Sequence, residues 1–266
     1  MTSYASYFKL QIKRNLQYKA SAISGLATQF FFGIINSLIY TSFYKRTSIT
    51  NFSVEELMCY IWLNQAFLNL VYIGIRDREI INSIKNGEIC YELTKPYDLY
   101  SFWFIKILSN RYVSTLLRCF TVLIFALLLP KPYKLSLPYS LKSFLLFLII
   151  LFLASILIVS INVIIMMITF FTNEEKGISS IINTLGGLLS GLEIPLLLLP
   201  PIVLKISNCL PFRYILDLPF RVYSGNIKYN EAIFSIKIQI FWIIFLILIG
   251  RKIMKYILRH VSNQGG

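Results

Sequence analysis

"SFLLFLIILFLASILIVSINVIIMMITFFT", residues 143–172, is a run of thirty residues without a charged side chain. A helix that crosses the hydrocarbon core of a bilayer needs about 20 consecutive apolar residues. Helices also satisfy their own backbone hydrogen-bonding groups, which lipid cannot do. The run therefore predicts a membrane-spanning helix and an all-α membrane protein.

The composition of the whole chain agrees with this fold class. Hydrophobic residues make up 56% and charged residues only 14%, whereas soluble domains carry about 25% charged residues. We expect a single transmembrane domain over residues 1–266. Six segments reach or approach spanning length: 21–43, 56–75, 100–129, 142–172, 178–201 and 232–250.

The formal net charge is +14, and many basic residues lie near the two ends of the chain. They are Lys9, Lys13, Arg14 and Lys19, and then Arg251, Lys252, Lys255 and Arg259. Cytoplasmic flanks of membrane proteins carry an excess of Lys and Arg, and an even number of spans puts both termini on one side. We expect cytoplasmic termini, contact with anionic membrane lipids and no nucleic-acid partner. The expected outer loops hold Arg213 and Arg221, so the bias is moderate.

The N-terminal segment 1–20 has apolar residues at steps of four: Tyr4, Phe8, Ile12 and Leu16. This spacing predicts an amphipathic helix on the inner membrane surface. A simple basic tail that orients the first span is the alternative.

The most polar segment, residues 77–98, follows the second expected span. Ile80, Ile81 and Ile84 give it a short apolar helix face, and Gly87 is a typical residue after a helix end. On the six-span topology this helix is cytoplasmic. It either packs on its own membrane domain or docks into a groove of a partner protein.

"LSGLEIPLLLLPP", residues 189–201, places Glu193 between Gly191 and Pro195 inside an apolar run. A charge and a broken helix both require surroundings other than lipid. We therefore predict an outer vestibule here and a re-entrant outer segment over 190–231. Before the break, Asn183, Gly187 and Ser190 form a stripe of small and polar residues, which favours close helix packing.

Three further sets of charged or polar residues call for partners. Arg111 and Arg118 are seven residues apart on one face of the third span. We expect them to contact an anionic substrate or headgroup, or to have partners inside the protein. We expect Lys106 to extend its ammonium group to the inner membrane surface. Asn173 follows the fourth span and is expected to cap the next helix, with Glu174 and Glu175 in the first turn of that helix beside its positive dipole end. A contact of these residues with a basic partner surface would be additional.

Several motifs of other protein classes are absent from the sequence. It has no GxxxxGK[ST] stretch, so we expect no ATP bound in the P-loop manner and no cofactor. Its four cysteines are scattered and it has one histidine, which predicts no metal site and no catalytic residues. A secondary transporter or a small-molecule-binding membrane module is the alternative, with Arg118 and Glu193 as its coupling or substrate groups.

Two motifs of this sequence have counterparts in known membrane proteins. The first is "SIKNGEICYELTKPYDLY", residues 83–100, with Gly87, Glu88, Leu93, Lys95 and Pro96 as the matching residues. The second is "SGLEIPLLLLPP" with the later "CLPF" and "YSG", within residues 190–225. These motifs and the order of the segments resemble the membrane subunit of type-2 ABC exporters, the ABC type 2 permease family. The chain is similar in particular to one branch of that family, long known only as a domain of unknown function.

This resemblance implies a permease that pairs with a second copy or a related permease chain in a bacterial plasma membrane. Each subunit would engage a separate cytosolic ATPase, which holds ATP and magnesium. Residues 78–87 would be the coupling helix, with Arg78, Glu79, Ile80, Ile84, Lys85, Gly87 and Glu88 as contacts, and residues 173–176 the second contact. The translocation path or dimer interface would involve Asn183, Gly187, Ser190, Gly191, Glu193 and Pro195.

Overall fold

The computed structural model describes residues 19–46, 53–74, 77–172 and 176–260, and this part of the chain is helical with no strand. The expected interfacial helix before residue 19 and the loop residues Asn173, Glu174 and Glu175 lie outside it. The longer helices are α2 (Lys19–Arg46), α3 (Val54–Val71), α6 (Leu99–Leu128), α7 (Leu141–Thr172), α8 (Lys176–Ser190) and α11 (Tyr229–His260). The shorter helices are α4 (Arg78–Lys85), α5 (Ile89–Leu93), η1 (Leu196–Leu198), α9 (Pro201–Cys209), η2 (Phe212–Tyr214) and α10 (Asp217–Ser224).

Among the residues that the structure describes, four helices are long and apolar enough to cross a membrane: α2, α6, α7 and α11. They correspond to the first, third, fourth and sixth predicted spans. For the second and fifth spans the structure has α3, with 18 residues, and α8, with 15. A crossing by these two helices stays a prediction. The basic segment after residue 250 is helical as far as His260, because Met254 and Ile257 continue the buried side of α11.

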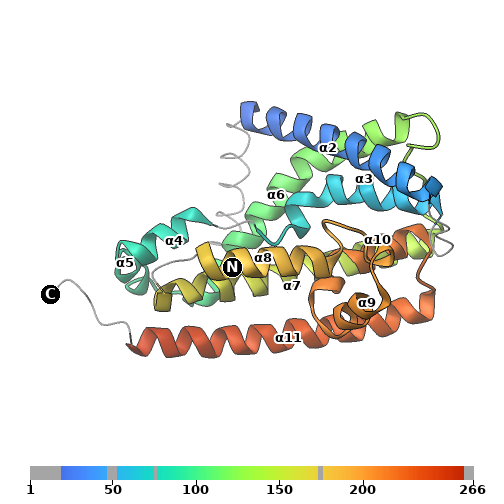
Figure 1. Cartoon of the computed structure of the whole chain (residues 1–266). Helices are drawn as coiled ribbons and strands as arrows, with labels where there is room; N and C mark the ends of the chain where they lie inside the picture. Colours follow the sequence, from blue (N-terminus) through green and yellow to red (C-terminus); the bar gives the residue numbers. More distant parts are fainter. Residues whose placement is uncertain (1–18, 47–52, 75–76, 173–175, 261–266) are drawn as a thin grey trace.

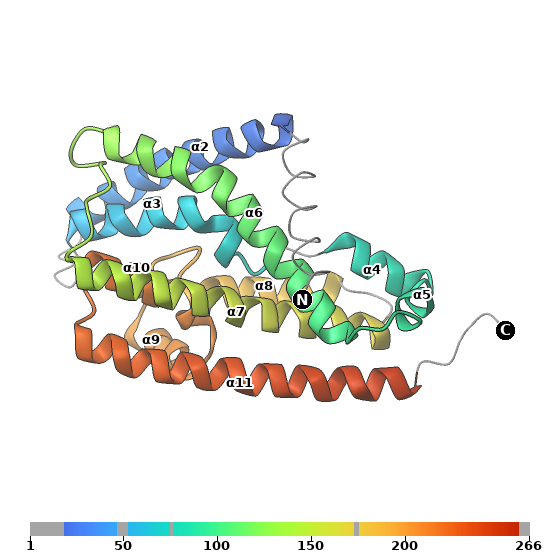
Figure 2. The ribbon, with the colours of Figure 1, turned by 180° about the vertical axis from the view of Figure 1, so that it is seen from behind.

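The long helices run along one another. Figures 1 and 2 show α7 and α11 extending along each other between the two ends of the molecule, whereas α2, α3 and α8 cover part of that length and α6 crosses obliquely. Helices α4 and α5 lie at one end, together with the C-terminal end of α11, and we call this the α4 end. The α6–α7 and α10–α11 connections lie at the other, far end.

The centre of the bundle is formed by α3 and α7. Ten consecutive α3 residues, Leu57–Ala66, are buried, because α3 is packed against α2, α6, α10 and α7. A Cβ atom at Gly33 of α2 would lie 2.5 Å from the Trp62 ring. Helix α7 packs against α11, α10, α6 and α4, and its Phe147 ring meets Phe67 and Phe220.

Short helices fill the segment 191–228 between α8 and α11. Helix α10 is buried almost throughout and packs against α3, α7 and α11. The chain therefore turns back from α8 into the bundle before α11 begins. That this segment is re-entrant from the outer side of a membrane stays a prediction.

Candidate functional site

Helix α4 begins at a defined cap. The Asp77 carboxylate accepts hydrogen bonds from the backbone N–H groups of Glu79 and Ile80, at 3.0 and 3.1 Å. An aspartate in this position satisfies N–H groups that have no partner inside the helix. The helix ends at Lys85, and Gly87 follows with a φ of 71°, the left-handed conformation that glycine adopts most readily. The predicted helix over 78–87 is confirmed, two residues shorter.

Polar contacts join α4 and α5 to α6. The Lys106 ammonium lies 2.9 Å from the Glu79 carboxylate and 3.4 Å from that of Asp77. The Trp103 indole N–H donates to the Glu92 carboxylate at 3.1 Å. Lys106 is 8% exposed. Its side chain therefore does not extend freely to the surface, in contrast to the prediction. Its charge is held against the first turn of α4.

The apolar face of α4 packs on the membrane helices. Ile80 and Ile81 are buried, Ile84 is half-buried, and α4 contacts α7. Of the two predicted alternatives, packing on its own domain is therefore what the apolar face does. The opposite face of α4 is exposed, with Arg78, Glu79, Asn82 and Lys85, and so are Gly87 and Glu88 after the helix end. It can meet a second protein without disturbing the isoleucines.

The helix break predicted at Gly191 is confirmed. Helix α8 ends at Ser190, and Gly191 has a φ of 83°. Three successive backbone carbonyls then accept hydrogen bonds from side chains. Tyr60 donates to Gly191 at 3.0 Å, Asn64 to Leu192 at 3.1 Å, and Tyr40 to Glu193 at 2.8 Å. We call these donors the carbonyl clamp.

The clamp explains how an apolar segment tolerates a broken helix. A backbone carbonyl without a partner in a low-dielectric environment costs several kcal/mol in principle. Side chains of α2 and α3 replace the missing helical donors. The break is therefore a packed element of the protein, and its geometry depends on two neighbouring helices.

The six candidate path residues have different environments. Gly187, Ser190, Gly191 and Pro195 are buried, and the Ser190 hydroxyl donates to the Gly187 carbonyl at 3.1 Å. Asn183 is half-buried. The Glu193 side chain is exposed, with its Cγ beside Gly187. The structure brings Gly187, Gly191 and Glu193 together at the end of α8, and their role in a path stays a prediction.

The two arginines of α6 bind within the protein. Arg111 is buried, and its guanidinium donates to the carbonyls of Asn69, Leu70 and Tyr72 at 3.1, 2.9 and 3.0 Å. These carbonyls are at the C-terminal end of α3, where helical donors run out. Arg118 is half-buried, and its guanidinium lies against Gly25 of α2. Internal partners are thus what the structure shows for Arg111.

A buried charged cluster near the far end was not predicted from the sequence. Asp217 of α10 is 0% exposed and lies 3.2 Å from both Arg213 and Arg221. Arg221 also donates to Asn226 at 2.9 Å, and the Asn226 amide lies 3.4 Å from the Glu56 carboxylate of α3. The spacing of four residues on each side of Asp217 is the signal that could have identified the cluster.

These features together define the class of protein. The described chain is a helical integral membrane protein with a helix fixed at one end of the bundle by ion pairs and a broken helix in the middle. The chain belongs to the ABC-2 family transporter proteins, whose family model matches residues 26–265. The resemblance seen in the sequence is confirmed, and the protein is the membrane component of an ABC transporter. A search of curated proteins finds no significant match.

Proposed function

We propose that this chain is the permease subunit of an ATP-driven exporter in a bacterial plasma membrane. It spans the membrane six times, with α3 and α8 as the second and fifth spans and both termini in the cytoplasm. Two permease chains, identical or related, form the path. A separate cytosolic ATPase binds ATP and magnesium and drives the cycle. Family membership supports the transport role.

The attachment of α4 is the observation that carries the ATPase coupling. A helix that transmits force needs a rigid connection to the part that moves. Lys106 provides it through two ion pairs, and Ile80 and Ile81 pack against the bundle. The exposed residues Arg78 and Asn82 are then the surface offered to the ATPase.

Helix α8 supplies the proposed path or dimer contact. Its Ile181 and Leu185 side chains are exposed on the isolated chain, and Glu193 follows at its end. An exposed apolar helix face suits lipid or a second permease chain. Glu193 forms the polar end of this face. A substrate would pass there from lipid-like surroundings into more polar ones.

Co-purification in detergent with the ABC ATPase encoded beside this chain tests the coupling. We would compare the unaltered chain with Arg78→Glu combined with Asn82→Arg, which leaves Lys106, Ile80 and Ile81 in place. A Kd that rises more than about tenfold is expected if these residues lie in the interface. Lys131→Glu, an exposed change at the far end, is the matched control.

Two results would contradict the proposal in different ways. Equal ATPase binding by the altered chain would mean that the outward face of α4 is not the docking surface. A chain that binds no ATPase and transports without one would overturn the exporter itself. A secondary transporter would then be the function to test, beginning with Glu193 and Arg118.

A further inference from the structure

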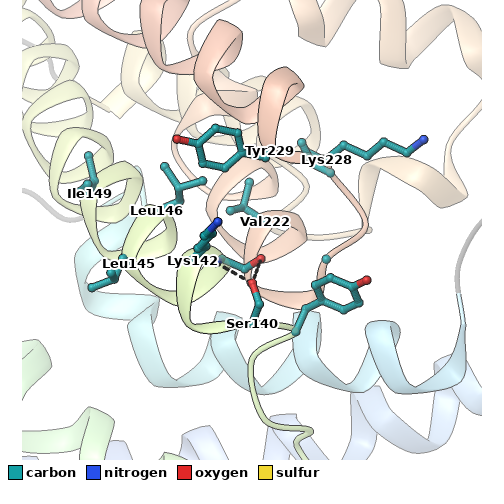
Figure 3. A pocket seen from close by; sticks show the side chains of 12 residues that line it. Ser140, Lys142, Leu145, Leu146, Ile149, Val222, Lys228 and Tyr229 are labelled. Atoms are coloured by element: carbon teal, nitrogen blue, oxygen red, sulfur yellow. Dashed lines mark hydrogen bonds between the residues drawn. The ribbon is translucent and has the colours of Figure 1, made fainter.

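A cavity of about 750 Å³ lies at the far end of the bundle. It is formed where α7 begins and where α10 passes into α11, and Figure 3 shows the side chains around it. Binding pockets for small molecules have volumes of about 300–1,000 Å³. The lining includes Ser140, Lys142, Leu145, Ile149, Val222 and Tyr229.

One side of the cavity is apolar and open to the surroundings of α7. Val222 is buried and forms part of its floor, whereas Leu145 and Ile149 are 54% and 52% exposed. The exposed apolar surface of α7 continues from there to Phe152. In a membrane this strip faces acyl chains, because α7 is the most apolar of the four membrane-length helices. A hydrocarbon chain can therefore run from the cavity along α7.

The other side of the cavity is polar and positively charged. Lys142 and Lys228 line it, and none of its described lining residues is acidic. In Figure 3 Lys142 lies toward the middle of the group, whereas Lys228 extends away from it. The Ser140 hydroxyl accepts from the Ser143 backbone N–H at 3.1 Å and caps α7. The positive end of the α7 dipole thus adds to the charge of Lys142.

We propose that this cavity binds an anionic amphiphile with a phosphate headgroup and an alkyl chain, as anionic membrane lipids have. The phosphate lies at Lys142, and the chain lies along Leu145 and Ile149. A basic side chain near a membrane surface gains about 1 kcal/mol from anionic lipid, equivalent to about fivefold in binding. The apolar strip distinguishes this ligand from free phosphate, because free phosphate would contact only the polar side of the cavity.

The binding test uses the full-length chain purified in neutral detergent, without any ATPase, so its outcome does not depend on the proposed coupling. Dioctanoyl phosphatidylglycerol, dioctanoyl phosphatidylcholine and inorganic phosphate are titrated separately while the unfolding temperature is recorded. Phosphatidylglycerol is expected to bind at least about fivefold more tightly than phosphatidylcholine. Inorganic phosphate is expected to bind much more weakly than either lipid.

Two lysine substitutions assign the binding to the cavity. Lys142→Gln is expected to remove most of the preference for phosphatidylglycerol, because it removes the charge that faces the cavity. Lys134→Gln changes an exposed lysine of the α6–α7 connection, at the same end but outside the cavity, and is expected to keep the preference. Both lysines are exposed, so neither change is expected to impair folding.

A third variant tests the apolar side. Ile149→Asn places an amide on the strip without changing charge, and it is expected to weaken both lipids and leave inorganic phosphate unchanged. The proposal is overturned if Lys142→Gln keeps the full lipid preference. It is also overturned if inorganic phosphate stabilises the protein as well as phosphatidylglycerol does, since the site would then hold a free anion.

Discussion

The ammonium of Lys106 lies 2.9 Å from the carboxylate of Glu79 and joins α6, a membrane-length helix, to α4. Lys106 is almost entirely buried, whereas the Glu79 side chain is 53% exposed. The pair is therefore buried on the side of the bundle and exposed on the side of α4. A displacement of α4 would reach α6 through this contact.

Replacing Lys106 with Gln is expected to loosen α4 without unfolding the bundle. The charge partner of Asp77 and Glu79 is lost, although the apolar contacts of Ile80 and Ile81 remain. Backbone hydrogen exchange over residues 78–85 should become about tenfold faster, equivalent to about 1.4 kcal/mol of local opening. Unchanged exchange, with Lys131→Gln as the control, would show that the ion pairs of Lys106 do not fix the helix.

Removing one donor of the carbonyl clamp is expected to destabilise the break after α8. Tyr60→Phe keeps the ring and leaves the Gly191 carbonyl without the hydroxyl that it binds at 3.0 Å. The loss should be about 1–3 kcal/mol, measured as thermal unfolding in detergent. Tyr91→Phe, at a side chain that is 75% exposed, is the matched control and should change little. Equal stability of both variants would mean that the Tyr60 hydrogen bond contributes nothing to stability.

Substitutions of Arg111 are expected to rank by how many α3 carbonyls they still reach. Arg111→Leu removes all three hydrogen bonds and should cost more than about 3 kcal/mol. Arg111→Lys keeps the charge but lacks the planar, five-donor group, so its cost should be intermediate. Unfolding temperature and purification yield measure the order. A leucine variant as stable as the lysine variant would contradict the capping role.

Changing Asp217 to Asn is expected to destabilise the far end strongly. Arg213 and Arg221 would keep two buried positive charges without their shared carboxylate, at a cost of about 3–5 kcal/mol. The triple change Arg213→Met, Asp217→Leu and Arg221→Met removes the charges of these three residues together. It should recover most of the lost stability. Monodispersity in detergent and unfolding temperature report both. If the triple variant is as unstable as Asp217→Asn, the arginines have another role.

Local sequence features determined much of the architecture. The uncharged run at 143–172 is sufficient for α7, because length and apolarity alone decide whether a helix can cross lipid. Gly191 and Pro195 were sufficient to locate the break, since one adopts positive φ readily and the other cannot continue a helix. Asp77 and Gly87 likewise mark the two ends of α4 through local sequence features.

Tertiary structure decided what those elements do. The sequence of α3 includes Glu55, Asn64 and Gln65, yet α3 lies at the centre of the bundle. Nothing in its own spacing indicates that Asn64 binds a carbonyl 128 residues away, or that Arg111 binds the end of α3. A polar side chain in a membrane helix needs a partner, and local sequence states only that need. Which partner satisfies it depends on which helices pack together, and that is fixed by the fold of the whole chain.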